Sequence, residues 1–418
     1  MRRLALFALL VGTLPAFADW PQWRGPKNDG HATATGLPTT WSESENVAWK
    51  CALPGTGAST PCIVGGNIFL TCQEGGDIVL LAIGTDGAIR WKNKLGSSKA
   101  TFRNDEGNLA SASCSADAER VYAFTGTGRL AAYDFAGKEV WGFDAQEKYG
   151  AFAIQFGIHQ TPVLHKGVYY VTLLHRKAQL VIALDAKTGS ELWKVTRSSD
   201  GKGESPDVYC SAIMWEKGND ALLIVHGNDY CTAHKPTNGA EVWRVVELNP
   251  KARYNTNWRA VSSPLVTPDL IVVPSCKRGV TVGIDPTTAK GTIEPGGPGE
   301  LWRIAKDTPD VPSPILVDDV VYIMGEGGFF YAYDAKTGKE IYSQRITNMR
   351  HRASPVLADG KLYLLGRDGV CVVAKPGREF EKLASNKLPD TFTASPAIDG
   401  NTLYLRGFAN LWAIRSSK

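Results

Sequence analysis

One sequence feature sets the architecture of this chain: a tandem repeat. Segment 183–193 (ALDAKTGSELW) recurs as segment 332–342 (AYDAKTGKEIY), and weaker copies end at Trp91, Trp141, Trp243 and Trp302. A period of about 40 to 50 residues, built from short apolar runs and glycine-centred turns, is typical of propellers and solenoids. We therefore expect an array of small β-sheets.

Residues 1–18 have the pattern of a secretory signal peptide. Arg2 and Arg3 form a basic start, residues 4–14 a short apolar run, and residues 16–18 (AFA) a small-residue cleavage site. The run is too short to span a bilayer. No cysteine follows the cleavage site, so the sequence indicates no lipid anchor of the bacterial lipoprotein type. We expect cleavage near Ala18 and a periplasmic or secreted protein.

The length of 418 residues would by itself suggest two or three domains. A closed ring of blades is instead one unit, which divides the chain into a signal peptide (1–18), an N-terminal arm (19–40) and a propeller (41–418). The 43 glycines and 12 tryptophans fit an all-β protein. The net charge of +4 gives no reason to expect nucleic acid as a partner. We expect no membrane span and a monomer.

Each repeat unit opens with a Ser-Pro-like pair in front of an apolar run. Proline suits the first residue of a strand because its missing N–H costs no ladder bond there. The number of such pairs predicts eight blades. The pairs are Thr60-Pro61, Ser113-Cys114, Thr161-Pro162, Ser211-Ala212, Ser263-Pro264, Ser313-Pro314, Ser354-Pro355 and Ser395-Pro396.

The last unit lacks its fourth strand, and the missing strand is found at the other end of the chain. Segment 49–53 (WKCAL) matches segment 91–95 (WKNKL) but has no unit of its own. We expect this N-terminal strand to complete the eighth blade, which hides sheet edges that would otherwise invite aggregation. The predicted fold is an all-β, eight-bladed β-propeller with four-stranded antiparallel blades, closed by the N-terminal strand.

The repeat motif also predicts contacts between blades. Asp185 or Asp334 can bond the backbone of the following turn, where glycine takes up positive φ. The aromatic residue that ends each unit would then lie on the outer strand, with its ring between neighbouring blades. A ligand platform is the alternative role for these rings. The predicted blade clamps are Trp49, Trp91, Trp141, Trp193, Trp243, Trp302 and Tyr342.

The cysteines leave two possibilities open. An oxidising compartment permits disulfides, but the cysteines are scattered nearly one per repeat, without a CxxC or vicinal pair, and spacing does not determine connectivity. They form at least one disulfide, or they fill buried strand positions as small side chains. They are Cys51, Cys62, Cys72, Cys114, Cys210, Cys231, Cys276 and Cys371.

These units resemble the pyrroloquinoline-quinone (PQQ) repeat of quinoprotein alcohol dehydrogenases and of the propeller lipoprotein in the outer-membrane barrel-assembly machinery. The resemblance runs from about Trp41 to the C-terminus and is weak near segment 375–377 (KPG). Segment 20–26 (WPQWRGP) is similar to the start of many secreted PQQ-like propellers. The dehydrogenases carry a vicinal cysteine pair and calcium ligands, and neither is found in this sequence. The resemblance implies fold kinship without establishing that the quinone binds.

Common catalytic motifs are absent, and the seven histidines lack metal-ligand spacing. In a propeller, however, the loops that lead into the innermost strands gather at one mouth of the channel, and several of these loops are long, polar and aromatic. Arginines with amide and aromatic neighbours suit an anionic or planar ligand; alternatively, they bond blade-end carbonyls, line a wet channel or dock a protein. The candidate ligand-binding residues are Arg103, Gln155, His159, Asn257, Trp258, Arg259, Arg350, His351 and Arg352.

Two functions follow from these features. The first is a non-catalytic binding scaffold, which would hold a cell-envelope protein or a small anionic or planar ligand at one propeller face and needs no cofactor. The alternative is an oxidoreductase of alcohols or aldose sugars that uses PQQ and calcium, although fold kinship alone is a weak reason to expect activity. The arm, with Trp20, Trp23 and Arg24, is expected to strap the propeller wall or one mouth, or to contact a partner.

Overall fold

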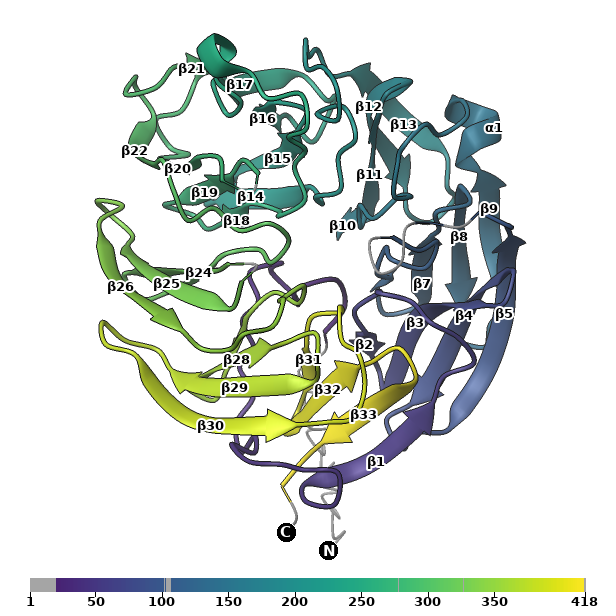
Figure 1. Ribbon diagram of the computed structural model, residues 1–418. Helices are drawn as coiled ribbons and strands as arrows, with labels where there is room; N and C mark the ends of the chain where they lie inside the picture. Colours follow the sequence, from purple (N-terminus) through teal and green to yellow (C-terminus); the bar gives the residue numbers. More distant parts are fainter. Residues whose placement is uncertain (1–19, 101, 103–106, 277, 326, 417–418) are drawn as a thin grey trace, which may run out of the picture.

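The computed structural model describes residues 20–100, 102, 107–276, 278–325 and 327–416. Within these residues the strands form eight sheets that stand around a common axis (Figure 1). The chain is therefore an eight-bladed all-β propeller, and the predicted fold is confirmed. The predicted signal peptide lies outside the described residues.

The first four blades are antiparallel meanders whose strands follow one another from the axis outward. Their strands are β2 (Cys62–Val64), β3 (Asn67–Glu74), β4 (Asp77–Gly84) and β5 (Ile89–Ser97) in blade 1; β6 (Ser115–Ala116), β7 (Arg120–Phe124), β8 (Arg129–Asp134) and β9 (Glu139–Asp144) in blade 2; β10 (Val163–His165), β11 (Val168–His175), β12 (Ala178–Asp185) and β13 (Glu191–Thr196) in blade 3; and β14 (Ile213–Lys217), β15 (Asp220–Gly227), β16 (Tyr230–His234) and β17 (Glu241–Val245) in blade 4.

The other four blades repeat this plan. Their strands are β18 (Leu265–Val266), β19 (Ile271–Pro274), β20 (Thr281–Ile284) and β22 (Glu300–Ile304) in blade 5; β23 (Ile315–Val317), β24 (Val320–Met324), β25 (Phe329–Asp334) and β26 (Glu340–Arg345) in blade 6; β27 (Val356–Ala358), β28 (Lys361–Leu365), β29 (Val370–Lys375) and β30 (Glu381–Lys387) in blade 7; and β31 (Ala397–Asp399), β32 (Thr402–Arg406), β33 (Asn410–Ile414) and β1 (Val47–Ala52) in blade 8. A helix, α1 (Ala145–Tyr149), follows blade 2, and a 3-10 turn (Lys251–Arg253) precedes blade 5.

The burial of each strand follows from its place in the blade. In β4, residues 78–84 are all buried, because both faces of this strand pack against neighbouring blades. The outer strand β5 is mostly exposed or half-buried, since one of its edges and much of its surface meet solvent. Inner strands therefore appear in the sequence as continuous apolar runs, and outer strands as mixed polar segments.

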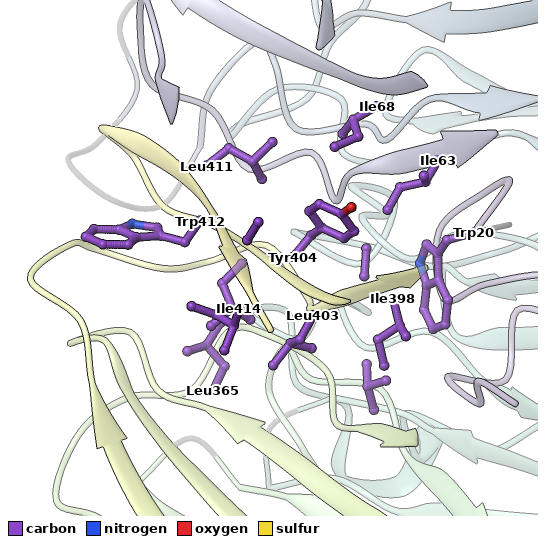
Figure 2. Packing of buried hydrophobic residues seen from close by; sticks show 14 of the residues in the cluster. Trp20, Ile63, Ile68, Leu365, Ile398, Leu403, Tyr404, Leu411, Trp412 and Ile414 are labelled. Atoms are coloured by element: carbon purple, nitrogen blue, oxygen red, sulfur yellow. The ribbon is translucent and has the colours of Figure 1, made fainter. Parts of the chain in front are cut away.

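Blade 8 joins the two ends of the chain. β1 pairs antiparallel with β33, with Trp49 opposite Ala413 and Cys51 opposite Leu411. The two strands lie side by side near the bottom of Figure 1, in purple and yellow. The apolar residues of blade 8 belong to one cluster with those of blades 1 and 7 and of the arm (Figure 2). The expected closure of the ring by the N-terminal strand is thus present.

Tryptophans connect neighbouring blades through a recurring contact. The indole N–H of one blade donates to a turn carbonyl of the next, and the ring lies against the glycine of that turn. In blade 2, Trp141 donates to the Ala186 carbonyl at 2.9 Å and covers Gly189, which has φ +71°. The other donor and carbonyl pairs, each also at 2.9 Å, are Trp49 with Thr85, Trp91 with Phe135, Trp193 with Pro236, and Trp302 with Ala335.

Two predicted clamp positions depart from this contact. Trp243 is 1 % exposed, and its indole N–H has no hydrogen-bond partner among the described residues. The turn that it should meet ends at Ala289 in place of glycine, and the longer loop behind it forms β21 (Gly291–Ile293), a fifth strand that pairs parallel with β17 of blade 4. At the second position, Tyr342 packs on Phe380 while Tyr322 bonds Gly377 of the next blade.

All eight cysteines are buried and none forms a disulfide, so the small-side-chain alternative describes them and the disulfide alternative does not. They lie in or near strands of blades 1, 2, 4, 5, 7 and 8, and Cys51 is on the outer strand β1. Burial raises the pKa of the Cys114 and Cys371 thiols to about 12, which keeps them protonated and unreactive at neutral pH.

The turn glycines under the tryptophans supply a test of this packing. A Cβ added at Gly189 would lie 2.6 Å from the Trp141 ring, whereas one at Gly167, in the same blade and at a similar φ of +79°, would meet no atom within 4 Å. Replacing Gly167 by Ala should cost about 1 kcal/mol, the cost of the backbone conformation alone. Gly189→Ala should cost about 2 to 4 kcal/mol, because overpacking adds to it. Urea unfolding of both variants measures the difference, and equal losses would show that the clamp tolerates a methyl group.

Candidate functional site

The eight blade starts form a closed belt of hydrogen bonds around the channel. At each start the backbone N–H of the hydroxyl residue donates to the side-chain oxygen of the equivalent residue in the next blade, at 2.8 to 3.2 Å. The last bond, from Ser395 to Thr60, joins blade 8 to blade 1 and completes the circle. In chain order the belt is Thr60, Ser113, Thr161, Ser211, Ser263, Ser313, Ser354 and Ser395.

The belt explains why a hydroxyl residue begins each unit, and it also leaves unused donors. An inner strand start has no antiparallel partner for its N–H, so the neighbouring hydroxyl oxygen satisfies this buried donor. A hydroxyl that accepts one bond still carries its own proton. Among the described residues no protein atom accepts that proton at any of the eight positions, although each side chain is at least 93 % buried.

A cavity of about 630 Å³ lies directly on the belt, at the mouth formed by the loops that lead into the inner strands. This volume falls within the range of roughly 300 to 1,000 Å³ that small-molecule sites occupy. All eight belt residues line it, together with the amides Gln73 and Asn108. Its aromatic lining residues are Trp23, Phe102, Phe156, Tyr209 and Phe408.

Two arginines and one carboxylate carry the formal charge of the cavity wall. Arg259 pairs with Glu204 at 2.5 Å, and its guanidinium lies 4.9 Å from the centre of the Phe156 ring. Arg352 lies 3.9 Å from Asp310. Glu204 does not line the cavity, but its ion pair compensates the charge of Arg259, so each guanidinium of the wall already has an acidic partner. A guanidinium has five N–H donors, more than one carboxylate uses, so the cavity can still bind an anion.

The opposite side of the channel is covered by the N-terminal arm. Trp20 forms a two-bond bridge with Ile63, and Pro21 accepts a hydrogen bond from Ala116. The arm then reaches blades 3, 6 and 7 at Leu164, Leu316 and Leu357. Each of these five contact residues follows a belt residue by three positions along the chain: they are Ile63, Ala116, Leu164, Leu316 and Leu357. The loops come before the belt residues in the chain, and the arm contacts come after them. The arm therefore crosses the channel on the side of the belt that faces away from the loops. Figure 2 shows Trp20 beside Ile398 of blade 8 and Ile63 of blade 1.

The arm is anchored by a buried cation and supplies part of the cavity wall. Arg24 is fully buried and donates to the Pro314 carbonyl at 2.7 Å and to the Asp29 carbonyl at 3.0 Å. Burial lowers the pKa of Arg24 to about 10, which still leaves it protonated at neutral pH. The neighbouring Trp23 lines the cavity. The arm is therefore an intramolecular strap over one mouth and the source of one cavity residue.

The structure brings only some of the predicted site residues to this cavity. His159, Arg259 and Arg352 line it. Trp258 and His351 do not, and Arg103 lies outside the described residues. Gln155, Asn257 and Arg350 are exposed and do not line the cavity. A ligand-binding role for any of these residues stays a prediction.

Several cavity residues were not predicted from the sequence. The sequence indicates the belt hydroxyls only as strand starts, although their occurrence at every start is a visible signal. Trp23, Asp310 and Phe408 had no such signal, since each reaches the cavity through contacts between distant segments.

The titratable side chains of the cavity wall are His159, Tyr209, Arg259, Asp310 and Arg352. The described residues contain no cluster of three or more His, Cys, Asp or Glu side chains that could hold a metal ion. The wall holds a single carboxylate, Asp310. Behind the wall, burial raises the pKa of the Asp207 carboxyl, and the ion pair with Arg176 opposes this rise. The geometry supports binding.

The fold and the site define a class of protein: a closed propeller that is strapped at one mouth and carries a ligand-sized cavity at the other. The chain belongs to the PQQ_2 family, described as outer membrane protein assembly factor BamB, which matches residues 31–174, 126–292 and 177–418. Within the described residues no helix is long and apolar enough to cross a bilayer.

Individual relatives agree with this family. The outer membrane protein assembly factor BamB of Moranella endobia (strain PCIT) is 28% identical over 274 residues, a match that spans 62% of this chain and 63% of that protein. The crystal structure of BamB from Moraxella catarrhalis superposes with a TM-score of 0.62 at 14% identity, covering 89% of this chain and 98% of that one. The crystal structure of quinohemoprotein alcohol dehydrogenase from Comamonas testosteroni superposes with a TM-score of 0.68 at 15% identity, covering 96% of this chain and 81% of that one. At these identities the two structures show a shared fold only.

Proposed function

We propose that this protein is a non-catalytic binding scaffold of the bacterial cell envelope, and that it holds a protein partner at the face around the cavity mouth. The observation that carries the proposal is the asymmetry of the channel. The arm covers one mouth, while the other is open and presents Arg259, Arg352 and a ring of loops.

The family supports the biological setting of this proposal. The BamB relatives are named as factors of outer membrane protein assembly, and a role in that process is the simplest assignment for this chain. The proposed location is the periplasm, reached after cleavage of the predicted signal peptide near Ala18. A rigid ring with exposed loops suits a scaffold, because function in such folds lies in loops held by a stable frame.

The quinoprotein alternative would require calcium ligands at the cavity. Calcium takes six to eight oxygen ligands, several of them carboxylates. The cavity wall offers one carboxylate, Asp310, which already lies near Arg352. The chain also lacks the vicinal cysteine pair of the dehydrogenases. These residues do not fit a PQQ and calcium site.

A cross-linking experiment in the producing cell tests the scaffold proposal. A photo-activated amino acid placed at Asn257, which is exposed beside the mouth, should give one defined protein adduct. The matched control is Leu192, which is 53 % exposed on the outer strand of blade 3, far from the loops. The adduct should form at Asn257 and not at Leu192. Loss of the protein should also reduce the level of assembled outer-membrane proteins.

The reverse pattern, with adducts at Leu192 only, would place the partner on the perimeter and contradict the proposed face. Unchanged levels of outer-membrane proteins would contradict the proposed process.

A further inference from the structure

We propose that the cavity binds an acidic sugar, a hexuronic acid or a short oligosaccharide that ends in one. This assignment rests on the proposed role of the mouth as a binding face, and it adds the chemical class of a small ligand. The belt donors, the aromatic wall and the two positioned guanidinium groups support it.

The belt specifies a ligand with oxygen atoms around its rim. Each belt hydroxyl has one proton and no protein acceptor for it among the described residues. A buried hydroxyl without an acceptor loses free energy, so a ligand oxygen in reach is favoured. The donors come from eight different blades and surround the axis, so a single small anion cannot meet them all. A polyhydroxylated ring presents acceptors in several directions and can meet many of them.

The aromatic residues specify an apolar face on the same ligand. Trp23 comes from the arm below the belt, while Phe156, Tyr209 and Phe408 come from three of the surrounding loops. His159 lies edge-on to Tyr209 with 5.4 Å between the ring centres, so this part of the wall is held rigid. Pyranose rings expose C–H groups on their flat faces, and burying such surface against aromatic rings is favourable.

The charges specify an acid. Arg259 is held in place by its pair with Glu204, and Arg352 stands near Asp310, so both guanidinium groups are positioned before a ligand arrives. A guanidinium binds a carboxylate through two parallel hydrogen bonds. Both guanidinium groups already have an acidic partner, so a carboxylate on the ligand is expected to add a second charged acceptor to one of these ion pairs. A neutral sugar offers no charged acceptor.

The test compares each acidic sugar with its neutral parent on the purified protein. Galacturonate and galactose, and glucuronate and glucose, differ only in the carboxylate. Calorimetric titration should show saturable binding of at least one uronate and at least tenfold weaker binding of its parent. Quenching of tryptophan fluorescence should follow the same titration, because Trp23 lines the cavity. Citrate, a carboxylate without a sugar ring, should not compete.

Two variants locate the site. Arg259→Gln combined with Arg352→Gln should weaken uronate binding at least tenfold. Arg378→Gln, which removes an exposed guanidinium paired with Asp319 on the perimeter, should leave binding unchanged. If the double variant does not fold, the comparison of uronates with their parents on the unmodified protein still decides the question.

Three results would overturn the proposal: no saturable binding of either uronate, equal binding of a uronate and its parent, or equal binding of citrate. None of them bears on the cross-linking result in cells, so failure of the ligand assignment and failure of the scaffold function can be told apart.

Discussion

A chain that begins at Gly55 is expected to lose the single cooperative unfolding transition of the closed ring. This truncation removes β1, so the whole edge of β33 from Asn410 to Ile414 loses its strand partner. It also removes Trp49, whose indole bonds the Thr85 carbonyl of blade 1. The expected loss exceeds about 5 kcal/mol, the lower end of the stability of natural proteins. Circular dichroism during urea unfolding should show a broad, early transition in place of a sharp one.

The truncation also removes the arm, and a permuted chain separates the two effects. The N–H of Arg415 donates to the Asn46 carbonyl at 2.9 Å, so a short turn can connect residue 416 to residue 46. A chain that runs from Gly55 to Ser416 and continues through such a turn into residues 46–54 lacks the arm but restores β1. Its sharp transition should return. If the permuted and truncated chains unfold alike, β1 does not close the ring and the arm is what stabilises it.

The blades could be predicted from the sequence because each is a local pattern. A hydroxyl residue, an apolar run, a glycine turn and a final tryptophan recur within about 50 residues, and such a unit determines its own strand order. The closing strand was predictable for the same reason, since segment 49–53 repeats segment 91–95. The β21 strand was not, because the loop that forms it departs from the repeat and pairs with a different blade.

The cavity was harder to predict because its residues meet only in the folded ring. Arg259 and Arg350 precede blade starts in similar loops, yet only Arg259 lines the cavity, and sequence spacing does not show which side chain turns inward. Arg24 reaches Pro314 across 290 residues, so the course of the arm follows from no local signal. The belt could be predicted only in part. Its hydroxyls are visible in every unit, but their mutual bonds exist only once eight blades have closed.

Buried histidines should make this protein lose stability in mild acid. Burial lowers the pKa of His226 and His351 from the ordinary value of 6.5 to about 4. The charge of nearby Arg197 acts in the same direction on His226, whereas Asp368 opposes the shift of His351. His175 is shifted to about 4 by burial, with Lys177 acting in the same direction. All three rings are neutral in the folded protein at neutral pH.

The sign of the effect follows from proton binding. Below pH 6.5 the unfolded chain takes up protons that the folded chain excludes, so acid favours unfolding until the folded-state pKa near 4 is reached. The stability supplied by the neutral rings is therefore complete above pH 6.5 and is lost as the pH falls toward 4. At pH 5, His226 and His351 should each account for about 2 kcal/mol of lost stability. Urea unfolding at pH 7 and pH 5 measures the combined loss of stability from the buried histidines.

A single substitution assigns part of this loss to one ring. His226→Gln puts a neutral amide in the same buried position, where it cannot take up a proton in either state. Whatever the variant costs at pH 7, its further loss between pH 7 and pH 5 should be smaller than that of the unmodified protein by about 2 kcal/mol. An unchanged difference between the two pH values would mean that His226 contributes nothing to the acid sensitivity, and that the loss comes from His175, His351 and other titrating groups. Because burial is the main cause of the lowered pKa of His226, such a result would contradict the burial of this ring.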